Sequence, residues 1–335
     1  MPASRTKTWI KKALVRSHIL GAAGRLSRPS AAILMYHSIV EEPKLTENIL
    51  GTSKSTAVFE AHMKALARWF APVTIEQVVQ FAEEGRKLPS KAVAVTFDDG
   101  FADNYDTALP ILSRYGIPAC FYIMVNAVAT GIPPWYCQLR FAFGTTCKPD
   151  WSDPERHQTY SMTAPAGRER ALSAAWEIGA QKTGSAQEEF VRQVEESLEV
   201  ESLGTQRGLM LTWEQVKALR KAGHVIGGHT LSHPNLAHIS KQEAQSEIAG
   251  CKKRIEQEIG EPIKHFSYPH PALNPQWTPQ TLQITREVGF RSAVLTKCGP
   301  VRAGDEPLAL KRTNAPNDLD EWIWNLQTTL LGRSA

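Results

Sequence analysis

Two adjacent carboxylates, Asp98 and Asp99, stand at a position suited to catalysis in this chain of 335 residues. They follow an apolar run over residues 92–97 that has the pattern of a buried strand, and Gly100 lets the backbone turn sharply after them. Carboxylates directed into one cleft repel each other, so such a pair needs a cation, hydrogen bonds or a shared proton. The alternative is that an aspartate here only caps the next helix.

His229 and His233 form a second candidate pair, directly after an apolar run over residues 225–228. Imidazoles four residues apart converge on one metal ion when the segment between them turns helically. With ten histidines in the chain this spacing also arises by composition, so two loop histidines bound only to water are the alternative. One aspartate with both imidazoles would form a common ligand set for a catalytic divalent ion, with Zn²⁺ expected first. The other aspartate would be free to act as a base, and such an arrangement hydrolyses acyl bonds.

The elements that must position these side chains alternate between strands and helices. Buried strands are predicted over residues 31–35, 92–97, 119–125, 225–228, 263–268, 292–295 and 308–312. Helices are predicted over residues 56–70, 74–85, 103–115, 212–222 and 241–259, three of them opened by capping-box patterns at Thr74, Thr212 and Ser240. The alternation is typical of parallel βα units, which bring the carboxyl ends of their strands to one mouth.

The pattern changes between about residues 132 and 210, which are first rich in proline and then polar and helical, over 168–180 and 187–198. No strand is predicted there. We interpret this segment as a largely helical insertion or lid within a domain spanning residues 31–330.

Residues 1–30 form a basic tail with seven Lys or Arg and no acid, which leaves a net charge of −3 on the rest of the chain. A slightly acidic body argues against nucleic-acid binding. Charged residues interrupt the segment where a signal peptide would be apolar, and no stretch approaches the length of a membrane span. The tail suits an amphipathic helix in peripheral contact with a membrane, or a solvated segment. We expect a cytoplasmic protein, peripheral to the inner face of the membrane if the tail binds there.

Three motifs resemble the polysaccharide deacetylase family, the NodB-homology domain of carbohydrate esterase family 4. They are Thr96-Phe97-Asp98-Asp99-Gly100, His229-Thr-Leu-Ser-His233 and Phe266-Ser-Tyr-Pro269, and the resemblance covers residues 31–126 and 211–313. It implies an α/β fold, an incomplete (β/α)7 barrel, and one divalent metal ion. It also implies that Asp98 is the general base and that Asp99, His229 and His233 are the metal ligands.

The segment Met35-Tyr36-His37-Ser38-Ile39 resembles the opening motif of the branch that deacetylates exopolysaccharides. This implies that His37 is the general acid, and a buried structural histidine is the alternative. Many members have an arginine that orients the base at the position of Ser267. Arg312 is the expected substitute partner of Asp98, with a structural salt bridge as the alternative.

Further expectations concern the substrate. Tyr268, Pro269, His270 and Trp135 are candidates to bind sugar. Trp135, Tyr136 and Trp151 of the insertion have aromatic faces that could stack on sugar rings, and the alternative is that they form the insertion's own core. The family implies removal of N-acetyl groups from a polysaccharide or its lipid-linked or oligosaccharide precursor, in exopolysaccharide or cell-envelope polysaccharide biosynthesis. The alternatives are a hydrolase of sugar O-acetyl esters or of another amide, and a catalytically silent carbohydrate-binding protein of the same fold.

Overall fold

The computed structural model describes residues 29–41, 53–203 and 208–332. Seven parallel strands form a closed ring, in the order β1, β12, β11, β10, β9, β6 and β5, with β1 pairing again with β5. Their bounds are Ala32–Tyr36 (β1), Ala92–Phe97 (β5), Ala119–Ile123 (β6), Val225–Gly228 (β9), His265–Ser267 (β10), Ser292–Cys298 (β11) and Leu310–Asn314 (β12). The prediction of a (β/α)7 barrel, one strand short of the common eight, is confirmed.

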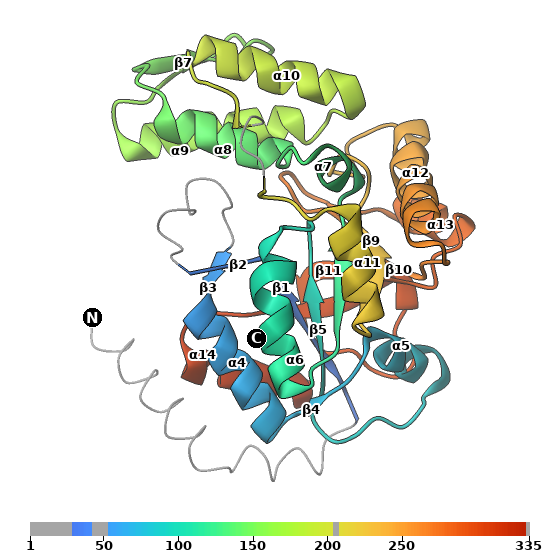
Figure 1. Ribbon diagram of the computed structural model, residues 1–335. Helices are drawn as coiled ribbons and strands as arrows, with labels where there is room; N and C mark the ends of the chain where they lie inside the picture. Colours follow the sequence, from blue (N-terminus) through green and yellow to red (C-terminus); the bar gives the residue numbers. More distant parts are fainter. Residues whose placement is uncertain (1–28, 42–52, 204–207, 333–335) are drawn as a thin grey trace.

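Short strands and helices surround the ring (Figure 1). The short strands are β2 (Ser38–Val40) paired with β3 (Ser53–Ser55), and β4 (Ala71–Pro72) at the edge beside β5. The helices are α4 (Thr56–Trp69), α5 (Ile75–Glu84), α6 (Leu109–Tyr115), α7 (Val125–Thr130), α11 (Trp213–Lys221), α12 (Lys241–Ile259), α13 (Pro279–Glu287) and α14 (Leu319–Leu330), with a π-helical turn over Asn104–Ala108 before α6. Thr74, Thr212 and Ser240 make the predicted capping boxes.

Alternate residues of the strands point to two different cores. Leu34 and Tyr36 of β1 pack outward against the helices, whereas Ile33 packs inside the barrel. The inner core also contains Val78 and Val79, so α5 closes the amino-terminal end of the ring. The carboxyl-terminal end is left for side chains that leave the strands, which is where active sites form in such barrels.

The segment after α7 forms a separate layer over the carboxyl-terminal end of the barrel (Figure 1). It contains α8 (Trp135–Thr145), the antiparallel strands β7 (Asp150–Ser152) and β8 (Thr159–Ser161), α9 (Pro165–Gly179) and α10 (Gly184–Ser197). It has its own hydrophobic core. The expectation of no strand between residues 132 and 210 is wrong, because β7 and β8 are only three residues long and too short to give a periodic signal.

The predicted basic tail, residues 1–30, lies outside the described residues except for Pro29 and Ser30. Ser30 is described, and its hydroxyl donates a hydrogen bond to the carbonyl of Leu330 at 2.8 Å. Among the described helices, none combines the length and the apolar character that crossing a bilayer requires.

Candidate active site

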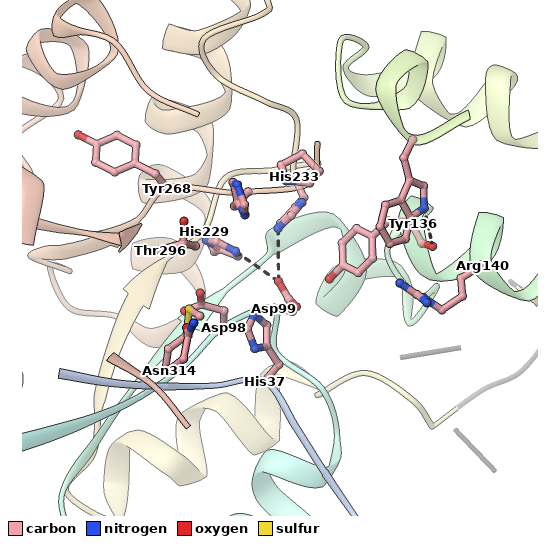
Figure 2. A pocket seen from close by; sticks show the side chains of 14 residues that line it. His37, Asp98, Asp99, Tyr136, Arg140, His229, His233, Tyr268, Thr296 and Asn314 are labelled. Carbon is pink, nitrogen blue, oxygen red and sulfur yellow. Dashed lines mark hydrogen bonds and ion pairs between the residues drawn. The ribbon is translucent and has the colours of Figure 1, made fainter. Parts of the chain in front are cut away.

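A cavity of about 400 Å³ opens at the carboxyl-terminal end of the barrel. His37, Asp98, Asp99, His229 and His233 all line it, from the ends of β1, β5 and β9. The structure therefore brings together five side chains that lie in three separate segments of the sequence. Figure 2 shows them around one space, with Asp99 between His37 and the two other histidines.

Asp98 is held by an arginine from the last strand. Nη1 and Nη2 of Arg312 donate to Oδ1 and Oδ2 of Asp98 at 2.8 and 2.7 Å, and Nε donates to the carbonyl of Leu295 at 2.9 Å. Ser267 adds a hydrogen bond from its hydroxyl to Oδ2 at 3.2 Å. Burial by itself would raise the pKa of Asp98, but the charge and hydrogen bonds of Arg312, together with the charges of His229 and His37, hold that pKa below its usual value. Asp98 is thus a fixed, ionised carboxylate.

Asp99 faces both histidines. Its Oδ1 lies 3.3 Å from Nε2 of His229 and 3.5 Å from Nε2 of His233, and one ligand atom from each residue falls within 4.8 Å of the others. All three side chains are buried. Asp99 Oδ1 and His233 Nδ1 have no hydrogen-bond partner among the described residues. A carboxylate and two imidazoles gathered in this way are the donor set of a divalent cation site.

The second nitrogen of His229 sets the direction of its ring. Nδ1 lies 2.7 Å from the carbonyl oxygen of Ser267, which accepts only if Nδ1 carries the proton. In the neutral ring Nε2 then presents its lone pair to Asp99 and to any cation there, an arrangement common for metal-binding histidines. Burial lowers the pKa of His233 to about 3, so this imidazole is neutral at pH 7.

The loop that carries both histidines is anchored from α12. Glu247 is buried and accepts hydrogen bonds from the backbone N–H groups of Leu231 and Ser232, both at 2.9 Å, and from the Ser232 hydroxyl at 2.6 Å. The backbone is left-handed at His233 in this loop, with φ of 61°, and also at Asp99 in the turn after β5, with φ of 76°. Such conformations are costly for residues other than glycine and persist where the surroundings impose them. The loop geometry is therefore maintained by its neighbours rather than by local preference.

A family model for polysaccharide deacetylases matches residues 85–293, which is more than half of the chain. The chain belongs to the polysaccharide deacetylase family. The Bacillus subtilis protein YxkH is 24% identical over 281 residues, covering 84% of this chain and 69% of YxkH. A poly-beta-1,6-N-acetyl-D-glucosamine N-deacetylase of Staphylococcus epidermidis is 27% identical over 116 residues, covering 32% of this chain and 40% of that protein.

Two solved structures share the fold of this polysaccharide deacetylase. The Streptococcus pyogenes deacetylase PplD has a TM-score of 0.58 at 21% identity, with 90% of this chain and 99% of that one covered. IcaB from Ammonifex degensii has a TM-score of 0.58 at 18% identity, with 90% and 98% covered. The predicted family and the prediction of a hydrolase that acts on carbon–nitrogen bonds are confirmed by the family match and by relatives named as deacetylases.

His37 lies at the mouth of the deacetylase cavity, just beyond β1. Its side chain is partly buried, and its carbonyl accepts a hydrogen bond from Nδ2 of Asn104 at 2.7 Å, which fixes the backbone at this point. Figure 2 shows its ring beside Asp99, on the side away from His229 and His233. The ring is therefore positioned over the same space as the two aspartates and is separate from the histidine pair.

Two of the four candidate sugar-binding residues line the cavity and two do not. Tyr268 and His270 line the cavity, although the Tyr268 ring is 1% exposed and its hydroxyl donates to Thr285 at 3.2 Å. Pro269 is buried and is not part of the cavity wall. Trp135 is placed in the core of the insertion, and its indole N–H donates to the carbonyl of His233 at 3.2 Å. A role in sugar stacking does not fit Trp135, because its ring is used to join the insertion to the histidine loop.

Of the residues that line the cavity of the deacetylase, seven are not among the site residues predicted from the sequence. Three of the seven belong to the insertion, and of these only Tyr136 was considered for sugar stacking. Tyr136, Arg140 and Trp176 line the cavity from α8 and α9. Tyr136 packs against His233 with ring centroids 4.9 Å apart, and burial and the Asp99 charge raise the pKa of its hydroxyl. The spacing of 136 and 140, one helical turn, was a signal in the sequence, but only the docking of the insertion on the barrel makes it meaningful.

Proposed function

We propose that this protein is a metal-dependent deacetylase that hydrolyses N-acetyl groups of a polysaccharide or of its lipid-linked or oligosaccharide precursor. The observation that carries the proposal is the convergence of Asp99, His229 and His233 beside the ionised Asp98. Relatives named as N-deacetylases of poly-beta-1,6-N-acetyl-D-glucosamine support a role in exopolysaccharide or cell-envelope polysaccharide biosynthesis.

The residues present fit a divalent metal ion. Asp99 Oδ1 is buried without a hydrogen-bond donor among the described residues, His233 is neutral, and the Nδ1 proton of His229 points to the Ser267 carbonyl, away from Asp99. The field of the two aspartates raises the pKa of His229 even though burial opposes it, and the same field attracts a cation. An ion held by Asp99, His229 and His233, with Zn²⁺ expected first, would supply a Lewis acid for the acetamide carbonyl and an acidified water.

The chain's own residues would then move two protons. Asp98 accepts a proton from the attacking water while the water oxygen bonds to the acetyl carbon. His37 gives a proton to the sugar nitrogen as the carbon–nitrogen bond breaks, so acetate and a free amine leave. Arg312 keeps the Asp98 carboxylate ionised and prevents it from turning away from the water. Tyr136 and Trp176 would receive the face of the sugar ring.

The test begins with metal content, because that needs no knowledge of the substrate. Wild type and an Asp99→Ala, His233→Ala double variant are incubated with Zn²⁺, freed of unbound metal and subjected to elemental analysis. We expect near one equivalent per wild-type chain and far less in the variant. Absence of binding by the wild type would reject the metal-dependent mechanism and favour a silent carbohydrate-binding protein.

Acetate release then separates the chemical alternatives. N-acetylated and O-acetylated oligosaccharides of the same sugar are compared, because the base and the metal would serve both bonds. Faster release from the N-acetylated set supports the proposal, and release from the esters alone would replace it with sugar O-acetyl ester hydrolysis.

The place of action is a separate part of the proposal. We propose that the protein works in the cytoplasm at the inner face of the membrane, held there by the basic residues of its amino-terminal tail, whose seven Lys or Arg suit an anionic lipid surface. Vesicles containing anionic lipid should bind the full chain and lose binding when residues 1–28 are deleted. Unchanged binding by the truncated chain would reject this placement.

A further inference from the structure

The helical insertion contributes one wall of the cavity. Tyr136 and Arg140 lie one turn apart on α8, so both side chains leave the same face of the helix. Trp176 comes from α9, and its indole N–H donates to the carbonyl of Tyr136 at 3.3 Å. Figure 2 shows the Tyr136 hydroxyl directed toward Asp99, with the Arg140 guanidinium facing the same space. The insertion therefore shapes what enters the cavity and does more than cover it.

Arg140 is a cation without an anionic partner in the described part of the chain. No ion pair and no hydrogen bond joins its guanidinium to the residues that the structure describes, and its Nε is buried with no acceptor. The guanidinium carbon lies 4.7 Å from the centre of the Trp176 ring, which holds the group in place. The exposed Arg192 of the same insertion differs, because it pairs with Glu189 and Glu196.

The acids of the cavity are already used by other groups. Both oxygens of Asp98 are bound by Arg312, and Asp99 faces the imidazoles of His229 and His233. Arg140 is thus a positive charge in this wall that no described acidic side chain neutralises. Arg140 is partly buried and its Nε is fully buried, so its charge is less well solvated than that of an exposed arginine. A ligand that carries a negative charge would compensate for this loss of solvation.

We propose that Arg140 binds a carboxylate or phosphate group of the substrate, next to the N-acetylated sugar. The substrate would then be an acidic glycan or a sugar phosphate rather than a neutral polymer. The planar guanidinium presents parallel N–H groups that match either anion, and the adjoining faces of Trp176 and Tyr136 suit the sugar ring. This inference rests on the proposed deacetylase function of the cavity, whose substrate class it narrows.

Three probes test the proposal by acetate release from the zinc-loaded enzyme. They are chitotetraose, which is neutral, a hyaluronan tetrasaccharide, which carries carboxylates, and N-acetylglucosamine 1-phosphate. We expect Arg140→Met to lower kcat/KM by about tenfold to a hundredfold on an anionic probe and to leave chitotetraose within about twofold. The anionic probe that responds identifies carboxylate or phosphate. Equal loss on all probes, or no loss on either anionic probe, would overturn the proposal.

Binding provides a readout that does not depend on turnover. Calorimetric titration of each anionic probe into wild type, Arg140→Met and Arg140→Lys is compared with Arg192→Met, which removes the same charge from the exposed side of the insertion. We expect Arg140→Met to weaken binding of the responding probe about tenfold or more, Arg140→Lys to lie between, and Arg192→Met to match wild type. Added salt should weaken binding of the responding anionic probe more in the wild type than in Arg140→Met.

The two proposals fail separately. If the wild type binds an anionic probe through Arg140 but releases acetate from none of the probes, the deacetylase function fails and the anion site stands. If chitotetraose is deacetylated while Arg140→Met binds and hydrolyses both anionic probes as the wild type does, the function stands and this inference is wrong.

Discussion

Arg312 donates hydrogen bonds from Nη1 and Nη2 to the two carboxylate oxygens of Asp98, at 2.8 and 2.7 Å, although the two residues are 214 positions apart in the sequence. The contact joins β5 to β12, which lie on either side of β1 in the ring. Both side chains are almost fully buried. Ser267, where many relatives in the family are expected to have an arginine, adds only one hydrogen bond to the same carboxylate. The arginine beside Asp98 therefore comes from β12 in this protein, and not from β10, where Ser267 lies.

Arg312→Met should impair catalysis and shift its dependence on pH. The guanidinium opposes burial and lowers the pKa of Asp98, so its removal raises that pKa. Activity that needs ionised Asp98 would then be lost at a higher pH as the solution is acidified. We expect kcat/KM to fall about tenfold to a thousandfold at pH 7, and the acidic limb of the pH profile to move upward.

The matched variant Arg312→Lys keeps the charge but loses the two-pronged contact. It should shift the acidic limb less than Arg312→Met while still lowering kcat. Thermal unfolding is measured in parallel, because breaking a buried ion pair costs about 3–5 kcal/mol. A variant that is destabilised but has the wild-type pH profile would show that the pair is only structural.

The convergence of the two aspartates and the histidine pair could be predicted from the sequence, because these residues follow strands with strong apolar patterns. Asp98 and Asp99 end β5 and His229 follows β9, and parallel strands bring such ends together whatever the details of packing. The insertion could not be treated in this way. Arg140 enters the cavity only through the docking of α8 on the barrel, and Trp135 faces its own core on the same helix. Neither orientation is encoded in a local pattern.

Replacement of His37 should affect substrates according to their leaving groups. An amine must be protonated as it leaves, whereas the nitrophenolate of 4-nitrophenyl acetate leaves without a proton. We expect His37→Gln to lower deacetylation of an N-acetylated oligosaccharide by about a hundredfold or more and to change ester hydrolysis by less than about threefold. Initial rates on both substrates check this. An equal loss on both would indicate that His37 is structural or acts before the bond to the leaving group breaks.

Trp135→Phe should weaken the histidine loop without a specific loss of sugar binding. The substitution removes the hydrogen bond from the indole to the carbonyl of His233 and leaves an aromatic ring in the core. We expect a loss of about 1–3 kcal/mol in the free energy of unfolding, and weaker Zn²⁺ binding in competition with a chelator.

Trp151→Phe is the control, because Trp151 is buried in the same core. It should lose stability to a similar extent while keeping the Zn²⁺ affinity of the wild type. A raised KM for Trp135→Phe with unchanged stability and metal affinity would restore the sugar-stacking role that the sequence suggested.

Glu76 joins α5 to the amino-terminal ends of β10 and β11. Its Oε2 lies 3.2 Å from Nε2 of His265, its Oε1 contacts Arg291, and Gln80 donates to Oε1 at 3.1 Å. The hydrogen bond from His265 lowers the pKa of Glu76 the most, burial opposes this, and the charge of Arg291 adds to the lowering. The result is a pKa of about 2 in the folded protein, against 4.5 as the ordinary value.

The stabilising effect of Glu76 should therefore depend on pH in a defined window. A carboxyl whose pKa is lowered by folding stabilises the protein fully above its unfolded pKa, near 4.5, and loses this effect as the pH falls through about 2. Glu76→Gln should lower the free energy of unfolding by about 2–3 kcal/mol at pH 7. The gap from wild type, followed by urea unfolding, should narrow between pH 4.5 and 2. Glu83→Gln removes another contact of Arg291 but leaves His265 paired, so it should cost less. A gap for Glu76→Gln that is the same at pH 2 and pH 7 would show that packing, and not the ionised carboxylate, is what α5 contributes at this end of the barrel.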